Sequence, residues 1–399
     1  MSSARPNPGT LRVLHLNSLL TGGGTDDQCV KVTHGLRQLG VEASLAGPEG
    51  RDYTTIARDL GIPFYVTPRE GPLKLRFIIE SARWIRRLKI HIVHGHHGRD
   101  IWPTLLAARL SGTQPKIVLT RHMAKSPSSW LSRRFLLGRC DAIIAVSRFV
   151  AEVLCEGHYE PGSPERERHA RPPLRGDYSR IRVLQGGIDT SRFRPFDAAA
   201  QRREWGLGPG DYAFGVVGGY DLPRGKGQRE FLRAAARIQA QVPAARFLII
   251  GRGNLEDRLR GDIRELGLEG KAWLTPYSRN VPAAMNAIDC LVHPQVGTEA
   301  LGMVVLEAFA CGKPVIASAL DGIPEAFDVA KLGQLVPPEN VEALAEAMQA
   351  WAGQPAPSPE RQAEMHARVE RDFSLAAAVG RVNTLYEQLM RDQPARDYP

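Results

Sequence analysis

Short apolar runs and longer amphipathic stretches alternate along the first half of the chain. Residues 11–16 form an apolar run that breaks into a glycine turn at residues 21–25, and a helical pattern follows and stops at Gly40. The same pattern continues with expected strands at residues 42–46, 63–66, 90–94, 116–120, 142–146 and 182–184, and expected helices at residues 73–88 and 102–110. Strands separated by helices predict a parallel sheet with helices on both faces.

A second series of the same kind begins after residue 190. Its expected strands are residues 213–217, 246–250, 272–274, 290–293 and 314–317, and its expected helices are residues 228–241 and 302–310. The pattern fails between residues 155 and 179, which are rich in Pro, Gly, Arg and Glu and predict an exposed insertion near residues 156–179.

The sequence therefore predicts an α/β fold of two doubly wound, Rossmann-like domains that face a central cleft. The first domain is expected at residues 1–190 and the second at residues 191–374. Residues 375–399 contain a final helical stretch that we expect to pack back on the first domain.

Composition agrees with two ordinary folded domains. The chain has 399 residues, 43% apolar and 24% charged, which is too long for one core at roughly 150 residues per domain. Its five cysteines are far apart and odd in number, as expected for reduced thiols of a cytoplasmic protein. The first ten residues are polar, and no window reaches the roughly 18 apolar residues of a membrane span, so only peripheral membrane contact is expected.

Charge is distributed unevenly along the chain. Residues 1–190 hold 28 basic and 17 acidic side chains, whereas the rest holds 24 and 26. A basic half is compatible with an anionic lipid, an anionic acceptor or nucleic acid, and also with a solvated Arg-rich surface. No nucleic-acid-binding signature is present, so nucleic acid is not an expected partner. The amphipathic residues 74–89 fit packing on the sheet, which we favour, or contact with an anionic membrane.

The segment with the clearest chemistry follows the expected strand at residues 290–293. Glu299 lies in the loop and Glu307 lies about one turn inside the next helix. A helix start at the carboxyl edge of a sheet offers the amides of Gly302, Met303 and Val304 to a diphosphate, and a carboxylate inside that helix can accept hydrogen bonds from a ribose diol. The alternative is that both acids only complement the helix dipole.

This segment resembles the E-x7-E signature of the retaining glycosyltransferases of family four, whose fold is called GT-B. Further segments fall where that family has similar ones: residues 22–24, 93–96, the strand ending at His122, and residues 143–147, 187–189, 308–317, 322–325 and 333–337. The resemblance covers nearly the whole chain. It is specific because several independent motifs occur in the same order.

The resemblance implies roles for individual residues. Glu307 would bind the donor ribose, Glu299 would lie beside the transferred sugar, and Lys226 would contact the phosphates together with the amides at residues 302–304. The arginine that the family has shortly after the preceding glycine turn is missing, and Arg224 would replace its charge. The chain also has Ala300 and Leu301 where the family commonly has Gly and Phe.

Four histidines gather at one expected strand end: His91, His94, His96 and His97. A metal site there is an alternative that we do not favour, because no cysteine or carboxylate stands at zinc-like spacing. The resemblance instead implies that His94 or His96 lines the cleft together with His122. Such a histidine can hydrogen-bond sugar hydroxyls or carry a proton, and a purely structural role is the alternative.

The glycine turn at residues 22–24 does not have the spacing of a dinucleotide fingerprint. In similar transferases this loop allows close approach of a substrate, which makes Gly23 a candidate binding residue. Asp26 and Asp27 follow it and are interpreted as ordinary acids at a helix start.

The function expected from these features is sugar transfer with retention from a nucleotide diphosphate sugar, without a metal or other cofactor. The basic first half favours a lipopolysaccharide or other lipid-linked glycan as acceptor, with the protein in the cytoplasm at the inner face of the membrane. Two alternatives stay open. One is a sugar-nucleotide epimerase of the same fold, and the other is a catalytically silent nucleotide-sugar-binding protein.

Overall fold

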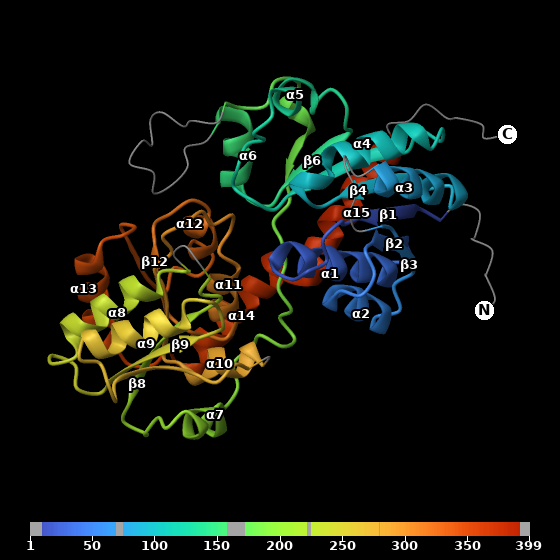
Figure 1. Cartoon of the computed structure of the whole chain (residues 1–399). Helices are drawn as coiled ribbons and strands as arrows, with labels where there is room; N and C mark the ends of the chain where they lie inside the picture. Colours follow the sequence, from blue (N-terminus) through green and yellow to red (C-terminus); the bar gives the residue numbers. More distant parts are fainter. Residues whose placement is uncertain (1–9, 69–74, 158–171, 222–224, 279, 392–399) are drawn as a thin grey trace. The chain divides into compact units, whose positions relative to one another are not determined.

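A computed structural model of the chain describes residues 10–68, 75–157, 172–221, 225–278 and 280–391. These residues form two compact units. Unit 1 contains the described residues up to 157, residues 172–187 and residues 375–391, and unit 2 contains residues 188–374. In Figure 1 residues 375–391, in red, therefore belong to the same unit as the blue strands and helices that begin the described chain.

Unit 1 is built on a parallel sheet of seven strands in the order β3-β2-β1-β4-β5-β6-β7. The strands are β1 (Arg12–Leu16), β2 (Glu42–Gly47), β3 (Phe64–Val66), β4 (Ile92–Gly95), β5 (Lys116–Arg121), β6 (Ala142–Ala145) and β7 (Ile181–Val183). The helices are α1 (Gly24–Gln38), α2 (Asp52–Asp59), α3 (Leu75–Arg87), α4 (Ile101–Leu110), α5 (Trp130–Phe135), α6 (Arg148–Glu156) and α15 (Leu375–Arg391), with short 3-10 turns η2 (Gly98–Asp100) and η3 (Tyr178–Arg180).

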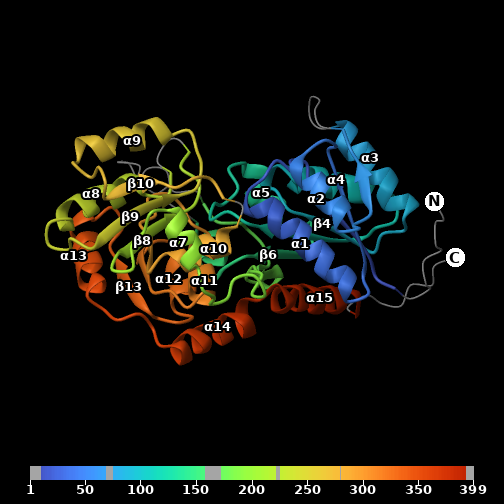
Figure 2. The ribbon, with the colours of Figure 1, turned by 90° about the horizontal axis from the view of Figure 1, so that it is seen from below.

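Helix α15 completes the core of unit 1. It lies alongside α1 (Figures 1 and 2), and Val379, Val382 and Tyr386 pack with strand residues such as Val13 and Val118. Tyr386 is fully buried. A segment more than 180 residues downstream of β7 thus covers one face of the first sheet.

Unit 2 repeats the architecture with six parallel strands in the order β10-β9-β8-β11-β12-β13. The strands are β8 (Tyr212–Val217), β9 (Ala245–Ile250), β10 (Ala272–Leu274), β11 (Cys290–His293), β12 (Val315–Ser318) and β13 (Gly333–Val336). The helices are α7 (Ala199–Glu204), α8 (Gln228–Ile238), α9 (Glu256–Glu265), α10 (Val281–Ala287), α11 (Met303–Ala310), α12 (Ile323–Phe327), α13 (Val341–Ala352) and α14 (Pro359–Phe373).

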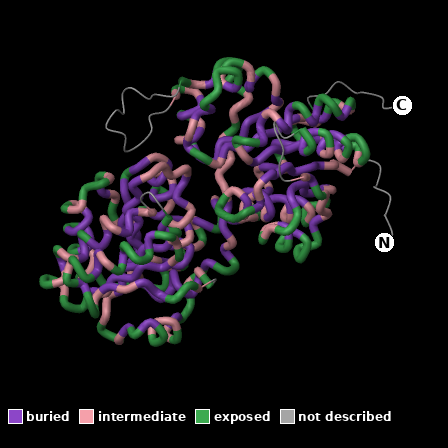
Figure 3. The backbone as a smooth tube through the Cα atoms, viewed as in Figure 1, coloured by how far each residue is buried: buried purple, intermediate pink, exposed green. Residues whose placement is uncertain are grey.

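The two faces of this second sheet carry separate cores, because successive strand residues point to opposite sides. Phe214 and Phe247 pack with apolar residues of α8 and α13, whereas Ala213 and Leu248 belong to a second cluster with α11 and α14. Most residues of these strands are buried, and Figure 3 shows buried segments in the interior of the unit. Burial on both faces explains why the strands read as continuous apolar runs in the sequence.

The strand order of each sheet reverses direction at one place, between β1 and β4 in unit 1 and between β8 and β11 in unit 2. Ligands of open α/β sheets bind at such a switch point, outside the carboxyl ends of the strands. The loops that follow these four strands are therefore the places to look for a site.

The predicted α/β class with two doubly wound domains is confirmed, and the expected strands occur within one or two residues of their predicted bounds. Helix α8 ends at Ile238, three residues before the expected residue 241. The expectation of an exposed segment at residues 155–179 is wrong at Leu174, which is fully buried and whose amide bonds to the carbonyl of Leu154. Residues 158–171 lie outside the described residues.

Among the described helices, none combines the length and the apolar character that a membrane span requires.

Candidate active site

In unit 2 the loops after β8 and β11 meet at the switch point of the sheet. The first loop ends in Lys226 and Gly227, directly before α8, and the second carries Glu299, directly before α11. The Nζ atom of Lys226 lies 2.8 Å from Oε2 of Glu299. The Lys226 side chain is 36% exposed and that of Glu299 only 18%, so this ion pair is partly withdrawn from water.

Three groups besides Lys226 act on Glu299. Its carboxylate receives a backbone hydrogen bond from Gly302, and Nε2 of His293 lies 4.0 Å from Oε2. The backbone amide of Glu299 donates to Oδ2 of Asp321, which fixes the loop. Burial raises the pKa of this carboxyl group, but the charge of Lys226, the influence of His293 and the hydrogen bonds outweigh it and hold the pKa below its ordinary value. Glu299 is therefore a carboxylate at neutral pH.

Helix α11 begins at this same place. Gly302 is its N-cap in the left-handed conformation, with φ of +83°, which glycine adopts without steric cost. Met303 and Val304 form the first turn, whose amides have no carbonyl partner within the helix. Glu307 follows in the second turn and is partly buried. The predicted pattern of amides, an inner carboxylate and a loop carboxylate is thus present on one helix start.

The turn that presents Lys226 lies directly against the end of β11. Gly227 has φ of +85°, and a Cβ atom at this position would lie 1.8 Å from the carbonyl oxygen of Pro294. The side chain of Gln228 spans the turn, accepting from the amide of Lys226 at 2.7 Å and donating to the carbonyl of Gly219. Lys226 can reach Glu299 only because residue 227 has no side chain.

The predicted replacement for the missing family arginine, Arg224, lies outside the described residues. Arg252 follows β9 at the same carboxyl edge, and its guanidinium lies 4.6 Å from the centroid of the Tyr277 ring. Arg252 is therefore a positively charged side chain at this edge of the sheet that the sequence analysis did not name as a candidate.

In unit 1 the loop after β1 is organised by Asp26. The carboxylate of Asp26 accepts from the amide of Gly22 and from Nδ2 of Asn17, and it pairs with Nε2 of His97 at 2.8 Å. Burial opposes ionisation, yet these hydrogen bonds hold the pKa of Asp26 below its ordinary value. Gly23 caps α1 with φ of +94°. The interpretation of Asp26 as an ordinary acid at a helix start is therefore wrong, because the side chain is buried and ties the glycine turn to the end of β4.

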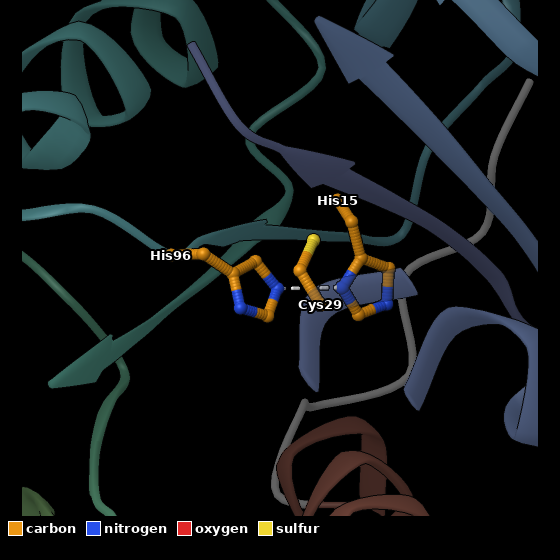
Figure 4. A group of neighbouring side chains, drawn as sticks. All are labelled: His15, Cys29 and His96. Atoms are coloured by element: carbon orange, nitrogen blue, oxygen red, sulfur yellow. Dashed lines mark hydrogen bonds between the residues drawn. The ribbon is translucent and has the colours of Figure 1, made fainter. Parts of the chain in front are cut away.

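Histidines from neighbouring strands form a second cluster in unit 1. Nδ1 of His15 lies 2.8 Å from Nε2 of His96 (Figure 4), and Nδ1 of His96 lies 3.3 Å from Nε2 of His122. His94 bonds to the hydroxyl groups of Tyr386 and Thr120, each at 2.6 Å. The predicted pair of His96 and His122 is thus in direct contact.

Burial keeps these rings neutral. It lowers the pKa of His15 to about 3. The pKa of His122 is also lowered to about 3, first by burial and then by His97 and Arg121, while Asp26 opposes the shift. The pKa of His96 lies well below its ordinary value, first through burial and then through His94 and its neighbours. The cluster therefore offers hydrogen-bond donors and acceptors rather than positive charge.

The alternative of a metal site at His91, His94, His96 and His97 does not match the grouping in the structure. His91 bonds to the amide and guanidinium of Arg12, and His94 and His97 have the partners named above. Among the described residues, the set whose atoms converge within 4.8 Å as metal ligands would is His15, Cys29 and His96 (Figure 4). In the structure Nδ1 of His15 and Nε2 of His96 are hydrogen-bonded to each other.

The sequence analysis thus named Glu299, Lys226, Gly302 and Glu307 as candidate site residues, and in unit 2 they lie together at the start of α11. It missed His293, whose ring is 1% exposed behind Glu299. Its position as the last residue of an apolar strand, at the switch point, was the available signal.

Comparison with known proteins identifies the family. Residues 197–369 match the family described as "Glycosyl transferases group 1", and residues 22–164 match "Glycosyltransferase Family 4". Each match covers most of one unit.

Curated relatives carry transferase names. The chain is 28% identical over 309 residues to a D-inositol 3-phosphate glycosyltransferase of Pseudarthrobacter chlorophenolicus, covering 73% of this chain and 70% of the relative. It is 24% identical to the lipopolysaccharide core biosynthesis mannosyltransferase LpsB of Rhizobium meliloti, covering 75% and 79%. It is 26% identical to a phosphatidyl-myo-inositol mannosyltransferase of Mycolicibacterium smegmatis, covering 82% and 80%.

Solved structures share the fold. A glycosyltransferase from Rickettsia africae superimposes with a TM-score of 0.81 at 18% identity, over 96% of this chain and all of that one. Anabaena Alr3699/HepE, solved with UDP-glucose, superimposes with a TM-score of 0.77 at 17% identity, over 95% of this chain and all of that one. Both predictions from the resemblance, the family and the GT-B fold, are confirmed: the chain belongs to the group 1 glycosyltransferases and is a glycosyltransferase of GT-B fold.

Proposed function

We propose that this glycosyltransferase takes its sugar from a nucleotide diphosphate sugar and transfers it with retention of the anomeric configuration. The observation that carries the proposal is the ion pair between Lys226 and Glu299 at the start of α11, on the switch point of the unit 2 sheet. A lysine, a helix start and a carboxylate meet there, which suits a diphosphate with a sugar attached.

In this proposal the diphosphate binds at the start of α11. The amides of Gly302, Met303 and Val304 and the ammonium of Lys226 stabilise its charge, and Glu307 accepts hydrogen bonds from the ribose. During transfer the bond between the anomeric carbon and the diphosphate oxygen breaks, and the diphosphate leaves with the electron pair. Positive groups already in place lower the barrier to this departure without a metal ion.

Glu299 would lie at the transferred sugar, and unit 1 would supply the acceptor side. A new bond forms between the anomeric carbon and an acceptor oxygen, on the face that the diphosphate leaves. The acceptor hydroxyl gives its proton to the departing diphosphate oxygen. His96 and His122 are neutral and hydrogen-bonded to each other. We assign them to hydrogen bonds with sugar hydroxyls at the glycine turn that contains Gly23.

The acceptor that we propose is a lipopolysaccharide or other lipid-linked glycan. Relatives of similar length are named for a lipopolysaccharide core and for phosphatidyl-myo-inositol, and the first half of this chain is basic. Four large apolar side chains of the neighbouring helices α3 and α4 are exposed: Leu75, Ile79, Leu106 and Leu110. Arg86 and Arg87 lie in the last turn of α3. Together these apolar and basic side chains suit peripheral contact with the anionic inner face of the cytoplasmic membrane.

The experiment is a thermal-shift panel of nucleotide sugars in EDTA, followed by mass spectrometry of products with lipid-linked and lipopolysaccharide acceptors. Stabilisation by one donor and a product heavier by one sugar are expected, and NMR of the product reports the anomeric configuration. Loss of transfer in EDTA would overturn the metal-free mechanism. An inverted product would overturn retention, and the variant Glu299→Ala with unchanged turnover would remove the proposed site.

The epimerase alternative is not favoured, because the relatives named above are transferases. The same product analysis separates the two, since an epimerase changes the donor in the absence of any acceptor.

A further inference from the structure

Among the residues that the structure describes, the buried His293 has no hydrogen-bond partner. Its ring is 1% exposed, and both Nδ1 and Nε2 are buried without a partner. A neutral imidazole carries one N–H donor and one acceptor, so such burial is costly unless another state of the protein satisfies it. The carboxylate of Glu299 lies close by, with Oε2 4.0 Å from Nε2.

Glu299 has a partner that the proposed donor would also need. Lys226 donates to Oε2 of Glu299 at 2.8 Å, whereas in the proposed function its ammonium binds the diphosphate. The single positive charge of Lys226 cannot neutralise both the carboxylate and the diphosphate, and a largely buried carboxylate that loses the hydrogen bond from Lys226 is destabilised unless another donor replaces it. Donor binding therefore requires a replacement partner for Glu299.

We infer that Lys226 passes from Glu299 to the diphosphate when donor binds, and that His293 then donates from Nε2 to Glu299 and holds the carboxylate beside the sugar. The inference rests on the proposed function of this site. His293 is thus a positioning residue, which acts through Glu299.

The surroundings limit the movement to side chains. Gly227 and Gln228 fix the backbone of Lys226, and Asp321 holds the amide of Glu299. A shift of about 1 Å brings Nε2 of His293 to the ordinary hydrogen-bond distance of about 3 Å from Glu299. Burial lowers the pKa of His293 to about 4, although Glu299 opposes this, so the ring donates as a neutral N–H.

The first experiment measures how Glu299 competes for Lys226. UDP and GDP are titrated into the full chain by calorimetry, and the one that binds the wild type is used as the probe. Glu299→Gln removes the competing charge, so the probe should bind about fivefold more tightly while turnover falls, because the surrendered ion pair is worth about 1 kcal/mol. The control is Glu346→Gln, which removes an equal charge from an exposed position on α13 and should change affinity less than twofold.

The second experiment tests His293 in the donor-bound state. His293→Leu should keep probe affinity within about twofold but lower kcat about tenfold, since Glu299 loses its second donor. His293→Gln, which restores an N–H, should recover most of kcat at equal thermal stability. NMR of ¹⁵N-labelled histidine should show a hydrogen-bonded Nε2–H only after the probe is added. The control is His34→Leu, at a half-buried position on α1 of unit 1, which should leave kcat within about twofold of the wild type.

The outcomes separate the inference from the function on which it rests. Absence of binding and transfer by the wild type would overturn both. If the wild type transfers sugar but Glu299→Gln weakens probe binding, or His293→Leu and His293→Gln have the same kcat, the exchange of partners is wrong and the proposed function stands.

Discussion

Replacement of Gly227 by alanine tests whether the site depends on the close approach of two backbones. The residue has φ of +85° and ψ of 21°, a left-handed conformation that costs an L-residue about 1–2 kcal/mol. The added Cβ would lie 1.8 Å from the carbonyl oxygen of Pro294, although real Cβ contacts are essentially never under 3.0 Å. The turn must therefore move by at least about 1.2 Å relative to β11.

This movement has two expected effects. Strain and displacement together should lower the free energy of unfolding of unit 2 by about 2–4 kcal/mol, which corresponds to a fall in Tm of about 5–10 °C for a domain of this size. Displacement of Lys226 by about 1 Å should lower the rate of transfer about 100-fold. Thermal unfolding followed by circular dichroism and initial rates of sugar transfer measure the two quantities.

Gly261→Ala is the matched control. Gly261 lies inside α9, its Cβ would meet nothing within 4 Å, and its φ is ordinary for a helix. Alanine there should stabilise the protein by up to about 1 kcal/mol and leave the rate unchanged. If Gly227→Ala instead keeps Tm within about 1 °C and the rate within about twofold of the wild type, the argument from this close approach is refuted.

Three further outcomes are expected. Glu307→Ala should raise KM for the donor about 10- to 150-fold with little change in kcat, because hydrogen bonds to a charged group contribute about 1.5–3 kcal/mol, and an unchanged KM would contradict its role at the ribose. Tyr386→Phe leaves Nδ1 of buried His94 unpaired and should lower the free energy of unfolding by about 1–3 kcal/mol in urea titrations. The pKa of His15 is lowered to about 3 and that of His293 to about 4 in the folded chain. Below their ordinary pKa near 6.5 the unfolded chain therefore binds more protons, and the free energy of unfolding should fall from pH 6.5 to pH 4 by up to about 1.4 kcal/mol per pH unit for each ring. A flat profile over that range would contradict their neutral burial.

The parts of the structure that local pattern determines were predictable from the sequence. The strand at residues 290–293 and the helix start at Gly302 were expected because an apolar run, a glycine and a helical pattern follow one another along the chain. The parallel order of the strands then brings the loops after β8 and β11 to one edge. The sequence motifs could therefore place Lys226 and Glu299 in one region, but their 2.8 Å ion pair depends on the fit of Gly227 against Pro294.

Contacts between distant segments were not predictable in this way. The bond between His94 and Tyr386 joins residues that lie 292 positions apart. It exists because α15 packs on β1, β4 and β5. The sequence predicted that this helix returns to the first domain, but not which side chains of the sheet it meets there. Asp26 looked like a solvated acid for the same reason. Only the folded arrangement places His97 and Asn17 around its carboxylate.

The return of α15 to the first unit means that unit 2 is topologically an insertion, entered after Gly187 and left after Ser374. On the ribosome, unit 2 is complete and free to fold while unit 1 still lacks the helix that carries Val379 and Tyr386. Unit 1 must therefore wait, with one face of its sheet covered in part by α1, until α15 emerges. A C-terminal deletion would damage the first domain of the chain and leave the second intact.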